Sequence, residues 1–380
     1  MKIVGIICEY NPLHSGHAKQ LQMVRWLCGA DTAIVCLMSG NFVQRGEPAI
    51  FHKSLRAGAA LQAGADLVLE LPVTYALSSA EGFAHGGVEI LGRFCDSLCF
   101  GAESGDGDTL MQTAKALLSP AFKAQLRIFL DQGLSFPAAR QQALAQLDER
   151  ARFLSSPNDI LGVEYCKAML KTGTSMTPLV IHRAGSYHDL QADRENPSAT
   201  SLRQRIMQGQ PIDDFVPTDL FRGASIHTRA AGERAILAKL RTMSECDFAE
   251  VPYGSEGLWR KLMHESRRQA DLEAILAAVK TKRYTMTRLN RMVMCAFLGI
   301  TAPMLSAPVP YTRILGFSAQ GREVLRKAKR SGSFYNVGEK IDDPYWTLEQ
   351  RCGNLYGLFA ADAPEPPADE AKQRVIIKEK

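Results

Sequence analysis

Short apolar runs alternate with amphipathic stretches through the first hundred residues of the chain. Residues 2–8 form a short run rich in β-branched side chains, which is typical of a buried parallel strand. Similar runs lie at 32–38, 66–71 and 97–100, and each of these stops at a Ser, Pro or Gly turn signal. The stretches between the runs have helical spacing, as at 53–63. This alternation predicts a parallel sheet that is covered by helices on both faces.

The pattern then becomes mainly helical between residues 110 and 170, with a break at Ser155–Asn158. Residues 178–182 form one more apolar run and predict a further strand. The segment 209–219 contains two prolines and three acids, a composition that favours a connection between domains.

Beyond that connection the pattern stays helical, apart from an irregular stretch with prolines at 303–317. The last residues are rich in Ala, Pro and charge, which is typical of a mobile end. We therefore predict an α/β protein in three parts. They are a Rossmann-like parallel-sheet domain at 1–215, a mainly α-helical domain at 216–355 and a flexible tail at 356–380.

Composition adds limits on where the protein works. The chain has 380 residues, with 46% hydrophobic and 22% charged, which is ordinary for a soluble globular protein with one or two domains. No apolar run is long enough to cross a bilayer, and the apolar run at the start is too short for a signal peptide. The nine cysteines are scattered without a Cys-x-x-Cys pair, which indicates reduced thiols. We therefore expect a cytoplasmic protein.

Positive charge is concentrated in one part of the chain. The formal net charge is +5, yet residues 280–330 hold eleven basic residues and one acid, so the rest of the chain is net acidic. Such asymmetry predicts a surface that binds a polyanion, and a solvated helix surface is the alternative.

The candidate chemistry lies in the segment Glu9–His17, directly after the first expected strand. Ligands of open α/β sheets bind at the carboxyl ends of the strands. The helix that Ser15 can cap offers unpaired N–H groups that favour phosphate. His14 and His17 are three residues apart and share one helical face, and Gly16 lets a phosphate or ribose approach the backbone. Two imidazoles there can stabilise a phosphorus centre that gains charge.

Two other interpretations of this segment remain open. Two histidines three residues apart can bind zinc, but no third ligand with suitable spacing stands out. A plain helix start is the second alternative, and a bare His-x-x-His would favour it. The position after the first strand favours phosphate chemistry instead.

The segment His14–His17 resembles the His-x-Gly-His signature of a nucleotidyltransferase superfamily that includes class I aminoacyl-tRNA synthetases and pantothenate synthetase. That superfamily has a second signature near the end of its sheet domain, a Ser/Thr-rich turn followed by a basic residue. The segment Ser198–Arg203 looks like this second signature. Its hydroxyls and the Arg203 guanidinium are then expected to hold the β- and γ-phosphates of ATP.

Longer motifs resemble one family of that superfamily, the bacterial tRNA(Met) cytidine acetate ligases. These motifs lie at residues 8–12, 38–48, 100–106, 156–162, 183–189, 282–285 and 310–317. The resemblance implies an enzyme that activates acetate with ATP as acetyl-adenylate. The acetyl group then passes to N4 of the wobble cytidine of elongator tRNA(Met), leaving AMP and pyrophosphate.

The resemblance also implies roles for particular residues. The catalytic residues are His14, His17 and Arg203, with Mg²⁺ expected on the phosphates. The nucleotide-binding residues are Ile7, Cys8, Glu9, Tyr10, Asn11, Pro12, Leu13, His14, Ser15, Gly16, His17, Ala18, Lys19, Gln20, Gly101, Asn158, Arg183, Ser198 and Thr200. For Gly101 a strand end, and for Asn158 a helix cap, are the structural alternatives.

Two further groups of residues are expected to meet the other substrates. Gln44 and Arg45 lie in a loop at the ligand edge of the sheet, where contact with acetate or cytidine and a plain surface turn are both open. The residues expected to bind tRNA are Lys280, Lys282, Arg283, Tyr284, Arg288, Arg291, Lys327 and Arg330. No obligate protein partner and no membrane is indicated.

Two rival functions fit part of the sequence. A small-molecule adenylyltransferase or carboxylate–amine ligase of the same superfamily explains the sheet and the phosphate signatures but leaves the basic region unexplained. A non-catalytic RNA-binding relative explains the basic region, while the retained His14, His17 and Arg203 argue against it.

Overall fold

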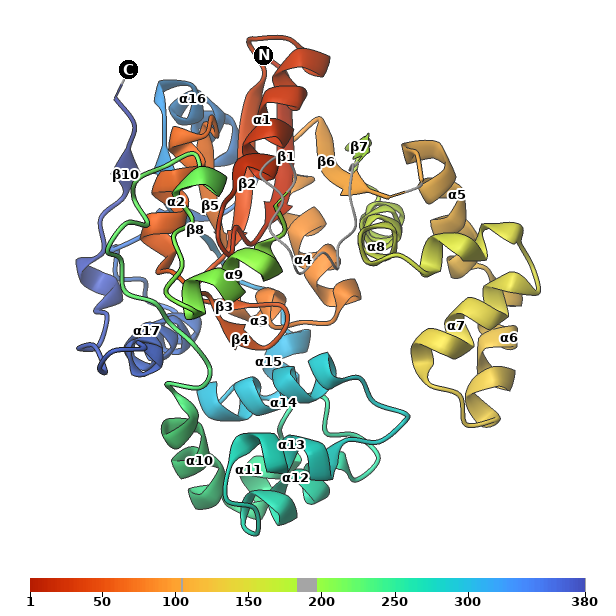
Figure 1. Ribbon diagram of the computed structural model, residues 1–380. Coiled ribbons are helices and arrows are strands. Elements are labelled where there is room, and N and C mark those ends of the chain that lie inside the picture. The colour runs from red at the N-terminus through yellow and green to blue at the C-terminus, as the bar shows by residue number, and fades with distance from the viewer. Residues whose placement is uncertain (104, 183–196, 380) are drawn as a thin grey trace.

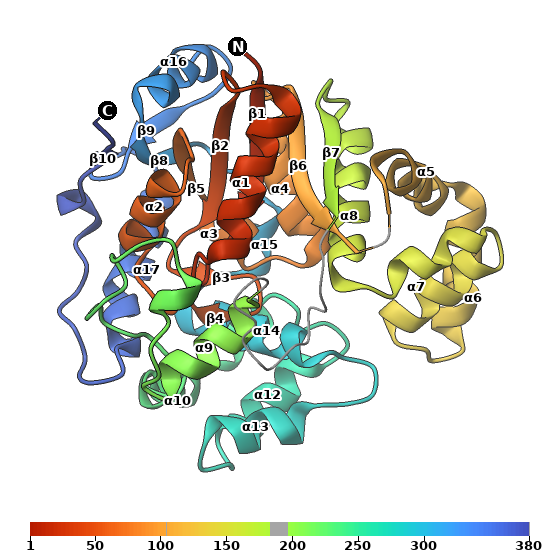
Figure 2. The same ribbon diagram turned by 45° about the horizontal axis from the view of Figure 1, so that its top comes forward.

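A central, mostly parallel β-sheet with helices on both faces forms the main body of the protein (Figures 1 and 2). The computed structural model describes residues 1–103, 105–182 and 197–379. The strand order is β10-β8-β5-β2-β1-β6-β7, with β9 beside β8 and a separate β3–β4 hairpin. The strands are β1 (Ile3–Cys8), β2 (Ala33–Ser39), β3 (Phe42–Val43), β4 (Glu47–Pro48), β5 (Leu67–Leu71), β6 (Ser97–Ala102), β7 (Thr177–His182), β8 (Thr312–Phe317), β9 (Phe334–Asn336) and β10 (Ile376–Ile377).

The helices divide into those that cover the sheet, those of a side extension, and those of a separate cluster. The sheet is covered by α1 (Ser15–Cys28), α2 (Lys53–Gln62), α3 (Val73–Ala76), α4 (Ala80–Leu91), α8 (Pro157–Thr172), α9 (Ala199–Met207), α16 (Ala319–Ala328) and α17 (Pro344–Tyr356). The side extension contains α5 (Gly107–Leu118), α6 (Pro120–Asp131) and α7 (Phe136–Ala145). The cluster contains α10 (Glu233–Thr242), α11 (Glu245–Ala249), α12 (Leu258–Ser266), α13 (Leu272–Val279), α14 (Met286–Leu298) and α15 (Ala302–Ser306).

The five strands predicted from apolar runs are confirmed, and they lie together as β5-β2-β1-β6-β7 in parallel register. β2 is buried along its whole length, so both faces of the strand must be apolar. Alternate residues pack on the two faces: Val35 and Leu37 belong to the core on the face covered by α4 and α16, while Ile34 and Cys36 belong to the core on the face covered by α1 and α2. This explains why the sequence shows continuous apolar runs rather than alternation.

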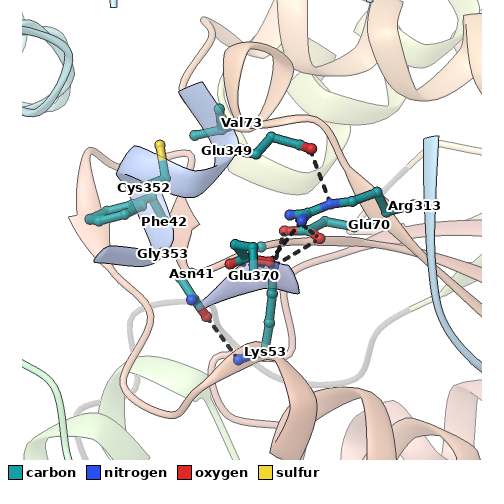
Figure 3. A pocket seen from close by; sticks show the side chains of 11 residues that line it. Asn41, Phe42, Lys53, Glu70, Val73, Arg313, Glu349, Cys352, Gly353 and Glu370 are labelled. Atoms are coloured by element: carbon teal, nitrogen blue, oxygen red, sulfur yellow. Dashed lines mark hydrogen bonds and ion pairs between the residues drawn. The ribbon is translucent and has the colours of Figure 1, made fainter. Parts of the chain in front are cut away.

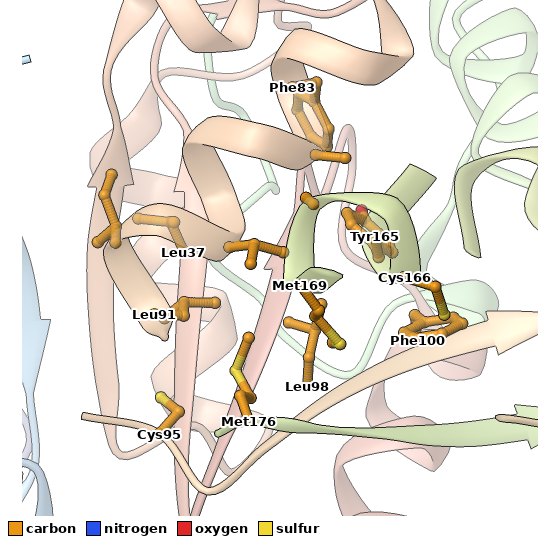
Figure 4. Packing of buried hydrophobic residues seen from close by; sticks show 14 of the residues in the cluster. Leu37, Phe83, Leu91, Cys95, Leu98, Phe100, Tyr165, Cys166, Met169 and Met176 are labelled. Atoms are coloured by element: carbon orange, nitrogen blue, oxygen red, sulfur yellow. The ribbon is translucent and has the colours of Figure 1, made fainter. Parts of the chain in front are cut away.

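The core on the α4 and α8 face continues to the edge of the sheet. Figure 4 shows Leu37 and Leu98 from the sheet meeting Leu91 of α4 and Met169 of α8. Burial of such side chains contributes about 1.5–3 kcal/mol each relative to exposure. This packing fixes the carboxyl ends of β1 and β6, between which the candidate site lies.

A separate hydrophobic core joins the helices from α10 to α14. Its centre includes Ile236, Leu262, Ile275 and Met292, all almost fully buried. Phe42 of the β3–β4 hairpin belongs to the same core, so the hairpin connects the sheet with this helical cluster. No helix in the described part of the chain is both long and apolar enough to span a membrane.

The predicted extent of the helical domain and the flexible tail are both corrected. β8 and β9 lie within 216–355 yet belong to the central sheet, with β8 antiparallel to β5. The expected tail at 356–380 is packed against the body: Phe359 and Glu370 are buried, and β10 pairs with β8. The physical reason is an ionic contact, because Glu370 is held by cations of the sheet domain.

These cations and their partners form a buried charge cluster, shown in Figure 3. Lys53 of α2 lies 2.7 Å from a Glu370 oxygen and 3.1 Å from Glu70. Arg313 of β8 contacts Glu70 and Glu370, each at 2.7 Å, and Glu349 at 3.1 Å. All five side chains are less than a tenth exposed, so these pairs are shielded from water. The chain end is therefore fixed to the sheet by charge pairs.

The cysteines agree with the expectation of reduced thiols. All nine lie in the described part of the chain as free cysteines, and most of them are buried. Burial raises the pKa of Cys166 to about 12, so this thiol stays protonated and inert.

Candidate active site

A pocket of about 460 Å³ opens at the carboxyl ends of β1, β6 and β7. The start of α1, the β3–β4 hairpin, α8 and the start of α9 complete its walls. The predicted site residues that line it are Ile7, Cys8, Glu9, Tyr10, Asn11, His14, Gly16, His17, Lys19, Gln20, Gln44, Arg45, Gly101, Asn158, Ser198, Thr200 and Arg203. Segments nearly 200 residues apart in the sequence therefore meet in one place.

Five predicted nucleotide-binding residues are not placed in the pocket wall. Leu13, just before α1, is buried in the core beneath that helix, and Ala18 of α1 is buried as well. Pro12 and Ser15 also do not line the pocket. Arg183 and the motif at 183–189 lie outside the described residues.

His14 and His17 are stacked against each other at the start of α1. Their ring centroids are 3.7 Å apart with an interplanar angle of 26°. The backbone N–H of His14 donates to Nδ1 of His17 at 3.3 Å, so the helix cap is His14 rather than Ser15. A neutral His17 that accepts at Nδ1 carries its proton on Nε2, the atom that can donate to a phosphate oxygen. The pair is thus preorganised by its own helix start.

Arg203 connects the second signature to the turn before α1. Its Nη1 donates to the carbonyl of Asn11 at 2.8 Å and its Nη2 to Thr200 Oγ1 at 3.2 Å. The Ser198 hydroxyl accepts from Ser201 N at 3.0 Å and caps α9. Two helix starts therefore meet at one pocket, and each offers backbone N–H groups and a positive dipole end to an anion.

Gly101 and Asn158 lie on the β6 side of the pocket. There the carboxylates of Glu103 and Asp159 connect the end of β6 with the start of α8. Asn158 Nδ2 donates to Glu103 Oε1 at 2.6 Å, and Asp159 N donates to Glu103 Oε2 at 3.0 Å. Glu103 N in turn donates to Asp159 Oδ1 at 2.9 Å. Asn158 is therefore not the cap of α8, which is Ser156; its side chain is oriented by Glu103.

Glu9 and the hairpin residue Gln44 form the opposite wall. Gln44 N donates to Glu9 Oε1 at 2.7 Å. Burial raises the pKa of the half-buried Glu9 carboxyl above its ordinary value, and the nearby Arg203, Arg56 and Arg45 act against this rise. The pocket lining thus combines the Glu9 carboxylate with the cations Arg45 and Arg203.

The hairpin that carries Gln44 and Arg45 rests directly on α14. Arg291 Nη1 donates to the Gln44 carbonyl at 3.3 Å. Gly46 has φ +76° and lies so close to the backbone of Asn290 that a Cβ atom would overlap it. Only glycine suits this position, because it tolerates both the left-handed backbone and the close contact. The hairpin is therefore a bridge between the pocket and the helical cluster, not a free surface turn.

The basic residues expected to bind tRNA separate into three groups. Lys280, Lys282 and Arg283 are exposed, although Arg283 pairs with Glu256 at 3.0 Å. Arg288 is half-buried and bonded to the Tyr253 carbonyl at 2.9 Å, and Arg291 is buried over the Tyr253 ring. The prediction that Arg291 binds tRNA is therefore wrong, because this side chain supports the hairpin and is not exposed to a partner.

Lys327 and Arg330 lie on or next to α16, away from the other basic residues. α16 follows β8, which runs antiparallel to β5, and Gln320 in its first turn donates to Asp31 O just before β2. The first turn of α16 therefore lies at the amino-terminal edge of the sheet, and Figure 1 shows α16 on the side of the sheet away from the β3–β4 hairpin. The structure therefore does not bring these two residues together with the site.

Several lining residues were not predicted from the sequence. Phe83, Phe100, Leu161 and Tyr165 line the apolar part of the pocket, and Glu47 adds a second carboxylate to the wall. Leu161 follows Asn158 by one helical turn and Phe100 precedes Gly101, so spacing from predicted residues was the available signal. No such signal marks Phe83 on α4.

Comparison with known proteins places this geometry in a family. Residues 1–370 match the family model described as HIGH Nucleotidyl Transferase. A curated relative from Clostridium novyi, named tRNA(Met) cytidine acetate ligase, is 37% identical over 88% of this chain and 88% of its own length.

Solved structures of a Thermotoga maritima protein named TmcAL share the fold. The apo form superimposes with a TM-score of 0.91 at 29% identity, and all of both chains is covered. A second form of that protein, bound with alpha-thio ATP, gives a TM-score of 0.88 at the same identity and coverage. The predicted fold class is thereby confirmed.

Proposed function

This chain belongs to the HIGH nucleotidyl transferase family and, within it, to the tRNA(Met) cytidine acetate ligases, and we propose that it joins acetate to the wobble cytidine of elongator tRNA(Met) with ATP. The products are N4-acetylcytidine, AMP and pyrophosphate. One observation carries the proposal: the stacked His14 and His17 face the same pocket as Ser198, Thr200 and Arg203. That arrangement suits the α-phosphate and the departing pyrophosphate of ATP.

In the first step an acetate oxygen attacks the α-phosphorus of ATP. The bond to pyrophosphate breaks and acetyl-adenylate forms. His14 and His17 stabilise the charge that grows on the α-phosphate, and Arg203 with the α9 helix start holds the pyrophosphate. Positioning and charge stabilisation account for such a step without a covalent intermediate on the protein.

In the second step the exocyclic amine of the cytidine attacks the acyl carbon of acetyl-adenylate, and AMP leaves. Gly101 and Asn158 border the nucleotide on the β6 side of the pocket. Gln44 and Arg45 border the opposite side, where the hairpin meets the helical cluster. The acetyl group is then transferred between the nucleotide wall and the hairpin.

The tRNA approaches over the helical cluster. The exposed Lys280, Lys282 and Arg283, with Tyr284 beside them, lie on the same part of the chain as α14, the helix that supports the hairpin. Cations there neutralise phosphates and an aromatic ring can stack on an exposed loop base. With tRNA as its substrate, the enzyme works in the cytoplasm.

We also propose that Mg²⁺ enters with the triphosphate. This ion is commonly held by substrate phosphates and one or two protein groups rather than by a full protein cage. Within residues 1–103, 105–182 and 197–379, no group of three or more His, Cys, Asp or Glu side chains is arranged to hold a metal ion. When bound, Mg²⁺ would neutralise charge on the phosphates.

Isotope exchange between ATP and pyrophosphate tests the first step. We expect exchange that depends on acetate and occurs without tRNA, because acetyl-adenylate forms reversibly. Exchange driven by another small carboxylate but not by acetate would instead favour a small-molecule adenylyltransferase. Absence of exchange with every carboxylate would favour a non-catalytic relative.

A further inference from the structure

Two carboxylates line the described part of a pocket that must accept two anions. They are Glu9, directly after β1, and Glu47 in β4. ATP and acetate are both negatively charged, so a carboxylate in the wall repels them at short range. The Glu47 carboxylate faces Arg229 at 4.0 Å. Glu9 needs a separate explanation.

The Glu9 residue is held firmly at both its backbone and its side chain. Its carbonyl accepts from Nη1 of Arg56 at 2.7 Å, and its Oε1 accepts from Gln44 N at 2.7 Å. Arg56 is fully buried and also donates to the carbonyl of Ser39 at 3.0 Å. A carboxylate can accept about four hydrogen bonds. The Glu9 carboxylate, which accepts one from the Gln44 backbone, can therefore still accept a proton or a hydrogen bond from a group in the pocket.

The surroundings of Glu9 make its carboxylate more basic than an ordinary glutamate. Burial raises its pKa, while Arg203 of α9, Arg56 of α2 and Arg45 of the hairpin lower it. Tyr165 of α8 also lines the pocket and interacts electrostatically with the same carboxylate. A general base works best when its pKa approaches the operating pH, so the rise improves its ability to take a proton.

We propose that Glu9 is the general base of the acetyl-transfer step. The amine nitrogen forms a bond to the acyl carbon, and the bond from that carbon to the phosphate oxygen breaks. AMP leaves with that electron pair, and the proton lost by the amine goes to the Glu9 carboxylate. The inference rests on the function proposed above, since it requires an amine acceptor.

A simpler role for Glu9 is to hold the hairpin through Gln44 N. The two roles are separated by Glu9→Gln and Glu9→Asp. Gln keeps the length of the side chain and an oxygen that accepts from Gln44 N, but it is not a base. Asp keeps a base and shortens its reach. If Glu9 is the base, the Glu9→Asp variant should transfer the acetyl group faster than the Glu9→Gln variant. If Glu9 only holds the hairpin, the Glu9→Gln variant should be the faster of the two.

The test supplies chemically prepared acetyl-adenylate and tRNA(Met) to the full-length enzyme and follows a single turnover. We expect Glu9→Gln to slow transfer by about 10²–10⁴-fold, with the acidic limb of the pH–rate profile lost. ATP–pyrophosphate exchange should fall far less than transfer in the same variant. Glu47→Gln is the matched control and should slow transfer much less than Glu9→Gln.

The assignment would be overturned if Glu9→Gln lost as much ATP–pyrophosphate exchange as acetyl transfer. It would also be overturned if Glu9→Gln transferred the acetyl group as fast as Glu9→Asp. A larger loss in Glu47→Gln than in Glu9→Gln would overturn it too, because that result would make Glu47 the base. A wild-type enzyme that shows neither acetate-dependent exchange nor transfer would refute the underlying function, which is a separate and recognisable result.

Discussion

His14 and His17 stack at 3.7 Å between ring centroids, and the first of them gives its backbone N–H to the ring of the second. The same contact that starts α1 therefore orients a ring of the site. A change in either histidine should alter both the helix start and the phosphate contact. The two effects can be separated because they appear in different measurements.

We predict that His17→Ala lowers acetate-dependent ATP–pyrophosphate exchange by about 10²–10³-fold, since one preorganised donor of this kind contributes about 2.7–4 kcal/mol to the transition state. Initial rates of acetate-dependent ATP–pyrophosphate exchange at saturating ATP measure this effect. His85→Ala, in an exposed histidine of α4, is the control and should keep its exchange rate. Full exchange in His17→Ala would remove this residue from the mechanism.

The hairpin prediction compares two glycines. Gly46→Ala and Gly64→Ala both place a side chain on a left-handed backbone, at φ +76° and +117°, which costs roughly 1–3 kcal/mol. Only Gly46 also meets another backbone, that of Asn290, while Gly64 has open space around it. We therefore expect Gly46→Ala alone to slow acetyl transfer to tRNA. Similar transfer rates in the two variants would argue against the bridge between hairpin and α14.

The buried charge cluster predicts a loss of stability with pH. Coulombic attraction from Lys53 and Arg313 outweighs the effect of burial and lowers the pKa of Glu370 to about 2. Its folded-state pKa lies below the unfolded value of about 4.3, so its contribution is fully present above that value. The contribution is lost as the pH falls towards 2.

We predict that Glu370→Gln lowers the free energy of unfolding at pH 7 by about 3–5 kcal/mol, because it leaves buried cations without part of their compensation. Urea denaturation at pH 7 and at lower pH measures this. Asp362→Asn, an exposed acid of the same chain end, should change little. The difference between wild type and Glu370→Gln should shrink as the pH approaches 2, and a constant difference would contradict the account.

The tRNA surface predicts a difference between two pairs of basic residues. Replacing Lys282 and Arg283 with Ala should weaken tRNA(Met) binding and reduce its salt dependence by roughly 0.7–0.9 in the slope per lost phosphate contact. Replacing Lys327 and Arg330, which lie on or next to α16 and do not line the pocket, should have a smaller effect. Filter binding over a range of salt concentrations measures both. Equal losses in the two double variants would show that the footprint extends around the molecule.

The parallel part of the sheet was predictable because its strands are buried on both faces. β2 is apolar from Ala33 to Met38, and a short continuous apolar run of this kind is typical of a strand buried on both faces. β8 was missed because Arg313 is its second residue, and a charged residue argues against a buried strand. Its charge is compensated by Glu70, Glu349 and Glu370, which are distant in the sequence.

The candidate site, like the sheet, has parts that were predictable from the sequence and parts that were not. The turn at His14–His17 and the start of α9 were predictable because each is a local signal beside a strand or helix start. The support of the hairpin by Arg291 was not, since it joins residues 247 positions apart in the chain. The contact by which Glu103 orients Asn158 was not predictable from local spacing either, because the two residues are 55 positions apart in the chain.

The proposal that the enzyme acetylates cytidine in tRNA(Met) is tested most directly by mass spectrometry of the tRNA. The purified enzyme is incubated with ATP, isotopically labelled acetate and elongator tRNA(Met), and the nucleosides are then analysed. We predict a labelled N4-acetylcytidine at the wobble position that requires ATP and is lost in His17→Ala. Labelled acetate that reaches no nucleoside, while ATP is still consumed, would contradict the account.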